Sequence, residues 1–171
     1  MPANIEIKAK VWDAARLRTE VESLSDGPAE ILDQADIFFR APSGRLKLRI
    51  LGDHHGELIF YRREDVAGPR PSRYLLAPTS DPTALQMILS SVLDVLGAVR
   101  KRRRLYWVGQ TRIHLDDVER LGEFIELEVI LHPDQPEDEG IAIARGLMDR
   151  LGIAEDQLVE RAYIDLLNDG A

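Results

Sequence analysis

Apolar and polar residues alternate with a period of two in several short stretches of the chain. Residues 4–10 read NIEIKAK, in which isoleucine and alanine alternate with polar residues that include Glu6 and Lys8. This period is typical of a strand with one buried and one polar face. The pattern predicts strands at 4–11, 32–40, 45–51, 57–64, 100–108, 111–118 and 123–131, and favours a further short strand at 71–77.

Helical stretches separate and follow these strands. Asp13 and Asp81 are suitable N-cap residues, Pro82 would occupy a first helical position, and Gly97 would end the second helix. The pattern predicts helices at about 13–24, 82–96, 136–151 and 155–168. Two blocks of antiparallel strands separated by a helix are typical of an α+β fold built on one large sheet or barrel. We expect a single domain spanning residues 1–171.

Most of the predicted strands are charged on one face and apolar on the other. Arg45, Lys47 and Arg49 share one face, and Glu126 and Glu128 share another. In an open sheet with helices on its apolar face, these charges would meet water. In a closed barrel with helices outside, the same charges would point inward. Patterning alone favours the open sheet, because charged side chains are seldom buried.

The overall charge is acidic, yet basic residues are clustered. The formal net charge is -8, while residues 100–104 read RKRRR and 45–49 read RLKLR. The acidic balance argues against nucleic-acid binding, and the basic runs suit either a solvated face or a local anion site. The chain has no cysteine, which excludes disulfides and thiolate chemistry. We expect a cytoplasmic protein without signal peptide or membrane segment. A homodimer is possible.

The N-terminal strand carries a recognisable signature. Residues 4–8, NIEIK, resemble the Glu-x-Glu-x-Lys strand of the CYTH superfamily, also called triphosphate tunnel metalloenzymes. Further segments resemble the family in the same order along the chain: PSGRLKLR (42–49), ELIFYRRED (57–65), DVAGPRPSRY (65–74), KRRRLYWVG (101–109), RIHLDDVERLG (112–122), FIELEV (124–129) and RAYIDLL (161–167). The resemblance covers nearly the whole chain and is nearest to class IV adenylate cyclase-like bacterial members.

The resemblance implies a fold and a chemistry. The fold is a closed antiparallel eight-stranded β-barrel, the triphosphate tunnel, with helices packed outside and charges inside. The implied function is metal-dependent binding of a small-molecule triphosphate, with Mg²⁺ or Mn²⁺ as cofactor. Adenylate cyclase activity, which converts ATP to cyclic AMP and pyrophosphate, is the first expectation. Hydrolysis of tripolyphosphate, thiamine triphosphate or nucleotides is the alternative, and a non-catalytic polyphosphate- or nucleotide-binding module is a third.

The resemblance also assigns roles to residues. Those expected to bind the triphosphate are Lys8, Lys47, Arg49, Arg62, Lys101, Arg103 and Arg112. Those expected to hold the metal are Glu6, Glu126, Glu128 and Asp116, and the catalytic candidates are Glu6, Lys8 and Asp116. Arginine and lysine form strong charge-assisted bonds to phosphate, and hard divalent cations take oxygen ligands.

One departure from the signature bears on activity. Asn4 stands where the family has its first glutamate, and a neutral amide is a poorer metal ligand than a carboxylate. This weakens the expectation of turnover more than that of binding. Among the other polar residues, His54 and His55 read as a solvated turn, and His114 as an acid, a base or a hydrogen-bonding group of the tunnel wall.

Overall fold

The computed structural model describes residues 1–170 and contains eight strands, four α-helices and one 3₁₀ turn in that range. The first half comprises β1 (Ala3–Lys10), α1 (Ala14–Leu24), β2 (Glu30–Phe39), β3 (Arg45–Gly52), β4 (His55–Arg63) and β5 (Arg70–Thr79). The second half comprises α2 (Pro82–Val92), β6 (Val95–Val108), β7 (Thr111–Val118), β8 (Gly122–Ile130), α3 (Glu137–Leu151), η1 (Glu155–Gln157) and α4 (Tyr163–Asp169).

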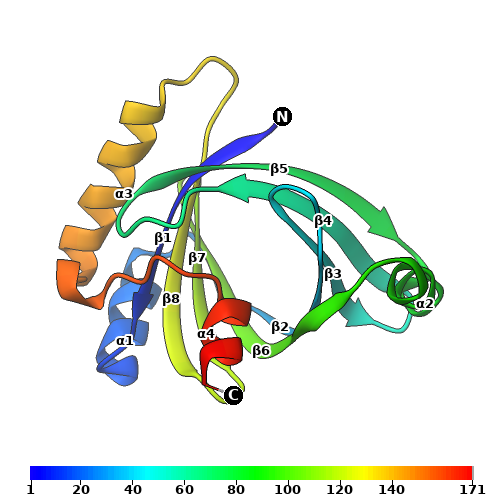
Figure 1. Ribbon diagram of the computed structural model, residues 1–171. Coiled ribbons are helices and arrows are strands. Elements are labelled where there is room, and N and C mark those ends of the chain that lie inside the picture. Colours follow the sequence, from blue (N-terminus) through cyan, green and yellow to red (C-terminus); the bar gives the residue numbers. More distant parts are fainter. Residues whose placement is uncertain (171) are drawn as a thin grey trace.

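The eight strands close into one antiparallel barrel. Their order around the barrel is β1-β5-β4-β3-β2-β6-β7-β8, and β8 pairs again with β1. The open sheet favoured by patterning alone is therefore wrong, and the barrel implied by the resemblance is confirmed (Figure 1). Closure depends on β5, which pairs with β1 on one side and β4 on the other.

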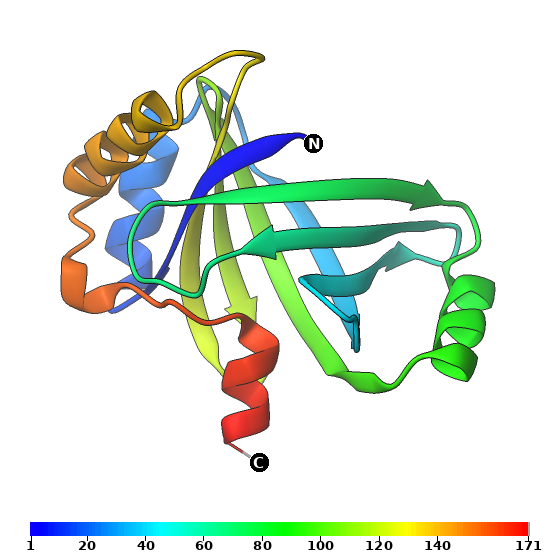
Figure 2. The same cartoon turned by 45° about the horizontal axis from the view of Figure 1, so that its top comes forward.

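Helices cover the outside of the barrel and thereby fix which strand faces point inward. Helices α1 and α3 lie together on one side and α2 lies at the far side, as Figures 1 and 2 show. Ile7 and Ile125, on the outer faces of β1 and β8, pack with Leu17 of α1 and Leu147 of α3. The apolar outer faces of β1 and β8 thus meet helices, and the charged faces of these strands are left to the interior. None of the helices in residues 1–170 is long and apolar enough to cross a membrane.

The C-terminal segment packs against one end of the barrel. Helix α4 packs through Tyr163 and Ile164 on Phe38, Val99 and Phe124, which lie near that end of β2, β6 and β8. The chain before α4 runs alongside β1, where the Val159 amide donates a hydrogen bond to the Lys8 carbonyl oxygen at 2.8 Å.

Several predicted boundaries differ from the structure. The second helix ends at Val92 rather than at Gly97, which instead lies inside β6 with φ of 142°. The predicted helix at 155–168 is a 3₁₀ turn followed by extended chain and the shorter α4. In both places pairing with another strand supplies the backbone hydrogen bonds that a longer helix would have made.

Candidate functional site

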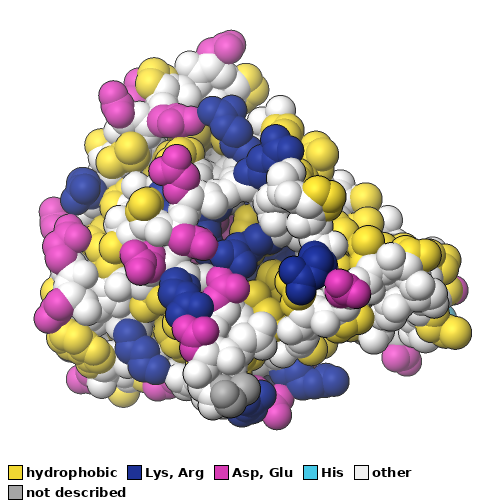
Figure 3. Space-filling view, in the orientation of Figure 1, with side chains coloured by type: hydrophobic (Ala, Val, Ile, Leu, Met, Phe, Trp, Pro, Cys, Tyr) yellow, Lys and Arg dark blue, Asp and Glu magenta, His cyan; other side chains and the backbone are white. Residues whose placement is uncertain are grey.

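The barrel encloses a polar cavity of about 460 Å³, a size suited to a small-molecule ligand. Its lining side chains come from alternate positions of all eight strands and from the segment before α4. Figure 3 shows Lys, Arg, Asp and Glu side chains around the central hollow of this face. The charged residues that line the cavity are Glu6, Lys8, Glu30, Asp36, Lys47, Arg49, Glu57, Arg63, Lys101, Arg103, Arg112, Glu126 and Glu128.

One wall of the cavity, which we call the basic wall, is organised around Asp36. This buried carboxylate accepts hydrogen bonds from Lys47 Nζ at 2.8 Å, Arg49 Nε at 2.8 Å and Lys101 Nζ at 3.2 Å. The residues come from neighbouring strands β2, β3 and β6, because Asp36 pairs with Arg49 across β2 and β3. Three cations around one anion leave an excess of positive charge facing the cavity, which is the requirement for an anion site.

Burial and mutual repulsion set the protonation of this wall. Burial lowers the pKa of Lys47 to about 7, with Arg49 adding to the effect and Asp36 opposing it. Burial also raises the pKa of Asp36, but Arg49, Lys101 and Lys47 outweigh it and hold that pKa well below its ordinary value. Asp36 is therefore ionised at neutral pH, and Lys47 is poised to gain or lose a proton.

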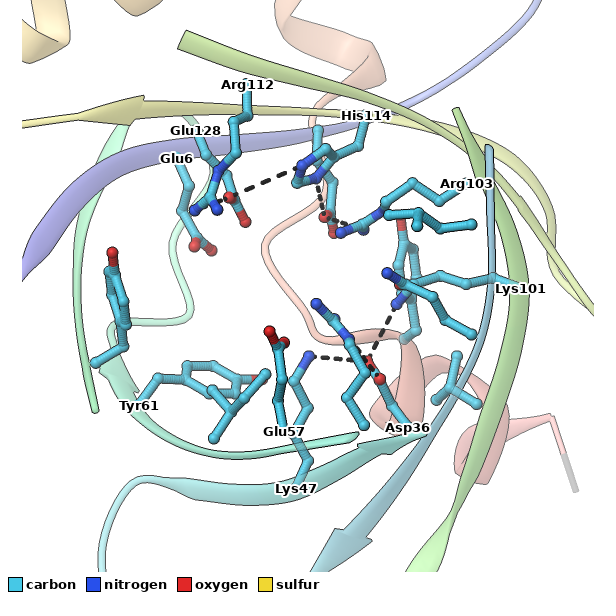
Figure 4. A pocket seen from close by; sticks show the side chains of 18 of the residues that line it. Glu6, Asp36, Lys47, Glu57, Tyr61, Lys101, Arg103, Arg112, His114 and Glu128 are labelled. Carbon is cyan, nitrogen blue, oxygen red and sulfur yellow. Dashed lines mark hydrogen bonds and ion pairs between the residues drawn. The ribbon is translucent and has the colours of Figure 1, made fainter. Parts of the chain in front are cut away.

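The opposite wall, which we call the acidic wall, carries Glu126 and Glu128 on β8 with His114 beside them on β7. One ligand atom from each of these three side chains lies within 4.8 Å of the others. The two carboxylates are also paired with bases: Glu126 lies 3.5 Å from Lys8 Nζ and 2.8 Å from Arg103, and Glu128 lies 2.8 Å from Arg112. Figure 4 shows Glu6, Glu128 and His114 across the cavity from Asp36 and Lys47.

Electrostatics at this wall favour charged carboxylates and a neutral imidazole. Burial raises the pKa of Glu126, but Lys8, His114 and Arg103 together hold it well below its ordinary value. Burial and the nearby Arg103 charge lower the pKa of His114 despite the two glutamates. Burial lowers the pKa of Lys8 to about 8, against the opposing effect of Glu126. Ionised carboxylates and an uncharged imidazole are the forms that bind metal ions.

Asp116 lies behind the cavity wall rather than in it. Its two oxygens accept hydrogen bonds from Arg103 Nε at 2.7 Å and from Arg103 Nη2 at 2.6 Å, and the Tyr163 hydroxyl donates a further one at 3.0 Å. The carboxylate is 2% exposed and does not belong to the cavity lining. These contacts suit a residue that orients Arg103 and anchors α4, not a metal ligand or catalytic group.

Glu6 points into the cavity from β1, where it faces Glu128 in the register of β1 and β8. Its Oε1 atom accepts a hydrogen bond from Arg63 at 2.5 Å, and the buried Arg70 lies 3.8 Å away. Asn4, two residues earlier on the same face, is 4% exposed, and its Oδ1 atom has no hydrogen-bond partner among residues 1–170. An unpaired buried acceptor beside a polar cavity is a position where a ligand or its water can bind.

The structure brings most of the predicted site residues into the cavity. Those that line it are Glu6, Lys8, Lys47, Arg49, Lys101, Arg103, Arg112, Glu126 and Glu128. Arg62 does not: it is exposed and donates a hydrogen bond to Ser43, whereas Arg63 lines the cavity. The expectation for Arg62 therefore needs correction, because the inward face of β4 carries the odd-numbered residues, as the lining by Glu57, Ile59 and Tyr61 shows.

Sequence reasoning also missed residues that the cavity contains. Asp36 lies in a segment predicted to be a strand. The adjacent apolar residues Ile37, Phe38 and Phe39 interrupt the alternation of polar and apolar residues that would have predicted an inward-facing Asp36. A period-two count from Leu32 through Gln34 reaches it. The turn predicted at His54 and His55 is shorter than expected: His54 is exposed in it, and the exposed His55 begins β4 and borders the cavity.

The residues of the acidic wall fit a divalent cation. Two carboxylates and one imidazole, close together at the surface of a polar cavity, form a donor set found in protein metal sites. The Nδ1 atom of His114 is buried and has no hydrogen-bond partner among residues 1–170, so the wall is left with an unused ligand atom. Basic groups stand directly beside and opposite this set, where a metal-bound anion would meet them.

Comparison with known proteins assigns the family. A sequence model of the CYTH domain matches residues 2–163. The chain belongs to the CYTH domain family. Proteins of this family bind triphosphate substrates and are metal-dependent, which agrees with the basic and acidic walls of the cavity. The match spans all eight strands and ends at the first residue of α4.

Individual similar proteins are distant in sequence, and a solved structure among them is close in fold. The chain is 22% identical over 169 residues to a Methanocaldococcus jannaschii protein named "Putative adenylate cyclase MJ0240", covering 95% of this chain and 97% of the relative. The PH1012 protein from Pyrococcus horikoshii OT3 is 25% identical, with a TM-score of 0.83 and coverage of 95% and 98%.

A plant structure has the same fold at lower identity. It is described as a "Putative adenylyl cyclase HpAC1 from Hippeastrum" that "reveals a dominant triphophatase activity". This chain is 16% identical to it, with a TM-score of 0.69 and coverage of 99% and 96%. At this identity the likeness extends to the fold alone.

Proposed function

We propose that this CYTH protein is a metal-dependent enzyme that acts on a nucleoside triphosphate, most closely in the manner of a class IV adenylate cyclase. The observation that carries the proposal is the two-sided cavity, in which Glu126, Glu128 and His114 face the cations gathered around Asp36. A triphosphate needs cations along its length and a divalent ion on its oxygens, and the two walls would supply both. Because ATP is a cytoplasmic metabolite, the protein would act in the cytoplasm.

The basic wall would bind and neutralise the phosphate chain. Arg49, Lys47 and Lys101 share one carboxylate, so each has donors left for phosphate oxygens. In cyclisation the ribose 3′-oxygen forms a bond to the α-phosphorus, the bond from that phosphorus to the bridging oxygen breaks, and pyrophosphate leaves. The 3′-hydroxyl proton passes to a base or water. Buried cations that neutralise the leaving pyrophosphate would lower the barrier of this step.

The acidic wall would hold the metal ion through Glu126 and Glu128, with Glu6 facing them from β1. When bound, Mg²⁺ or Mn²⁺ would withdraw charge from the phosphate oxygens and help to orient the substrate. Glu6 and Lys8 remain the catalytic candidates, since both point into the cavity. Asp116 is better placed to fix the Arg103 guanidinium, which it binds through both oxygens.

The cavity also contains a place for an organic group. Leu32, Leu51, Leu76 and Leu105 are among its lining residues. An apolar lining next to a phosphate site suits a substrate with an organic part, and inorganic tripolyphosphate would leave it unfilled. This favours a nucleotide as the substrate.

Hydrolysis of a triphosphate is the second candidate. The basic wall would contact the triphosphate part that all the considered substrates share, and the description of the Hippeastrum structure, which has the same fold, names a dominant triphosphatase activity. Asn4, with a neutral amide where the family signature has glutamate, would lower turnover in either reaction and favours the third reading, a binding module.

Phosphorus NMR separates these functions. The protein is incubated with ATP and, separately, with tripolyphosphate, first in Mg²⁺ and then in Mn²⁺. We expect pyrophosphate from ATP and no change in tripolyphosphate. Orthophosphate from either compound would make the protein a triphosphatase. In the Mg²⁺ samples, broadened resonances without products would identify a binding module, and unchanged spectra would contradict triphosphate binding altogether.

A further inference from the structure

His114 is a buried histidine that lies close to two carboxylates of the cavity. It lies on β7 directly across from Glu126 on β8. Its Nδ1 atom lies 3.5 Å from Glu126 Oε2, and its Nε2 atom lies 4.0 Å from Glu128 Oε2. The imidazole therefore sits between the two carboxylates of the acidic wall, as Figure 4 shows for Glu128 and His114.

The same imidazole is buried without a hydrogen bond on one nitrogen. His114 is 2% exposed, and among residues 1–170 its Nδ1 atom has no hydrogen-bond partner. Leaving a buried polar atom unpaired destabilises a folded protein. A metal ion held by the two glutamates would give the imidazole a partner and remove this cost.

Nitrogen in the ligand set changes which ion the site prefers. Mg²⁺ takes oxygen ligands almost exclusively, whereas imidazole suits first-row transition metals. We propose that His114 is a direct metal ligand, with Glu126 and Glu128, and that the site consequently prefers a transition-metal dication such as Mn²⁺ over Mg²⁺. This inference rests on the proposed function, since it concerns the metal that would accompany the triphosphate.

The spacing of the three side chains allows such an ion without a change of fold. Metal–ligand bonds of about 2.1 Å place neighbouring donor atoms about 3 Å apart and opposite ones about 4.2 Å apart. The present separations are within 4.8 Å, little wider than this range. Two carboxylates and a neutral imidazole also balance the charge of a dication.

Pulsed electron paramagnetic resonance tests the ligand directly. Mn²⁺ is bound to the purified protein together with tripolyphosphate, which contains no nitrogen, so any strongly coupled nitrogen must come from the protein. We expect ¹⁴N modulation of the Mn²⁺ echo in the wild-type protein and its loss in His114→Gln. His54→Gln, which alters an exposed histidine, is the matched control and should keep the modulation.

Isotope labelling provides a test without substitution, in case His114→Gln does not fold. Protein made with ¹⁵N-histidine should replace the ¹⁴N modulation by that of ¹⁵N. Modulation that is absent from wild type, or that survives His114→Gln, would overturn the inference while leaving the proposed function in place. A Mn²⁺–tripolyphosphate spectrum that the protein does not change at all would contradict the proposed function itself.

Competition between ions tests the preference. Mg²⁺ is titrated against bound Mn²⁺, and the concentration that displaces half of it is compared between wild type and His114→Gln. We expect Mn²⁺ to lose about tenfold or more of its advantage over Mg²⁺ in the variant, the scale on which altered metal surroundings change affinity. An equal ratio in the two proteins would overturn the claimed preference.

Discussion

At the scale of single residues, Lys47 links the site to pH. Burial and Arg49 lower its pKa to about 7, so its ammonium loses the proton as the pH rises through neutrality. A triphosphate binds the charged form better, and affinity for tripolyphosphate should therefore fall above about pH 7. The fall should reach up to about tenfold per pH unit for one proton. Calorimetric titrations between pH 6 and 9 would measure it.

Replacing Lys47 by arginine isolates this effect. Lys47→Arg keeps the charge at all these pH values, so its affinity should depend less on pH than that of wild type. Lys8 has a pKa of about 8, so the affinity of the Lys47→Arg protein should still fall somewhat at the alkaline end of the pH range. Lys10→Arg changes an exposed lysine outside the cavity and should reproduce the wild-type profile. Equal pH dependence in Lys47→Arg and wild type would show that another group controls binding.

Residue patterns predicted much of the site but not its details. Resemblance to the signature strand predicted that Glu6 and Lys8 face inward, and the structure confirms that both line the cavity. Arg62 and Arg63 are adjacent in β4, so an error of one residue in the predicted face makes Arg62 appear to face inward in place of Arg63. Asp36 was missed because a lone acid in a strand does not reveal the three cations that the β2–β3 and β2–β6 pairings bring to it.

At the scale of elements, α4 is attached to the cavity through one tyrosine. The Tyr163 hydroxyl donates a hydrogen bond to buried Asp116 at 3.0 Å, and its ring lies 3.8 Å from Lys8 Nζ. Tyr163→Phe keeps the ring and removes the bond to a charged group. We expect a loss of about 1.5–3 kcal/mol in the free energy of unfolding, measured by urea denaturation.

A second tyrosine provides the control for this effect. The Tyr106 hydroxyl donates to Glu22 at 3.1 Å, and Glu22 is 47% exposed. Because water can replace the lost partner there, Tyr106→Phe should cost under about 1 kcal/mol. A Tyr163→Phe protein as stable as wild type would mean that α4 is held by its apolar contacts with Phe38 and Phe124 alone.

Elements were predicted well where a segment's own pattern decides its structure. The caps at Asp13 and Asp81 and the alternating strands are local signals, and the elements they predicted are present. Gly97 looked like a helix end, but it lies in β6 opposite Phe38, next to a register shift in the pairing with β2. That contact joins residues far apart in the sequence, and no local pattern contains it.

At the scale of the whole molecule, closure of the barrel decides what the charges do. The same alternating strands would place them in water in an open sheet, and composition does not distinguish the two arrangements. Closure instead pairs acids with bases inside the barrel: Glu6 with Arg63, Glu126 with Lys8 and Arg103, and Glu128 with Arg112. A metal ion and a triphosphate would exchange these partners, the metal taking carboxylates and the phosphates taking bases.

This exchange predicts that metal and triphosphate bind cooperatively. A triphosphate alone would meet repulsion from Glu128, and a metal ion relieves it, so tripolyphosphate should bind about 5–150-fold more tightly with the metal than in a chelator. Glu128→Gln removes the repulsion while leaving Arg112, which is 29% exposed and can be hydrated. The variant should bind tripolyphosphate more tightly than wild type when metal is absent and gain less when metal is added, as measured by calorimetry. Weaker metal-free binding by Glu128→Gln would show that Glu128 helps the ligand by holding Arg112 in place, and the exchange of partners would be wrong.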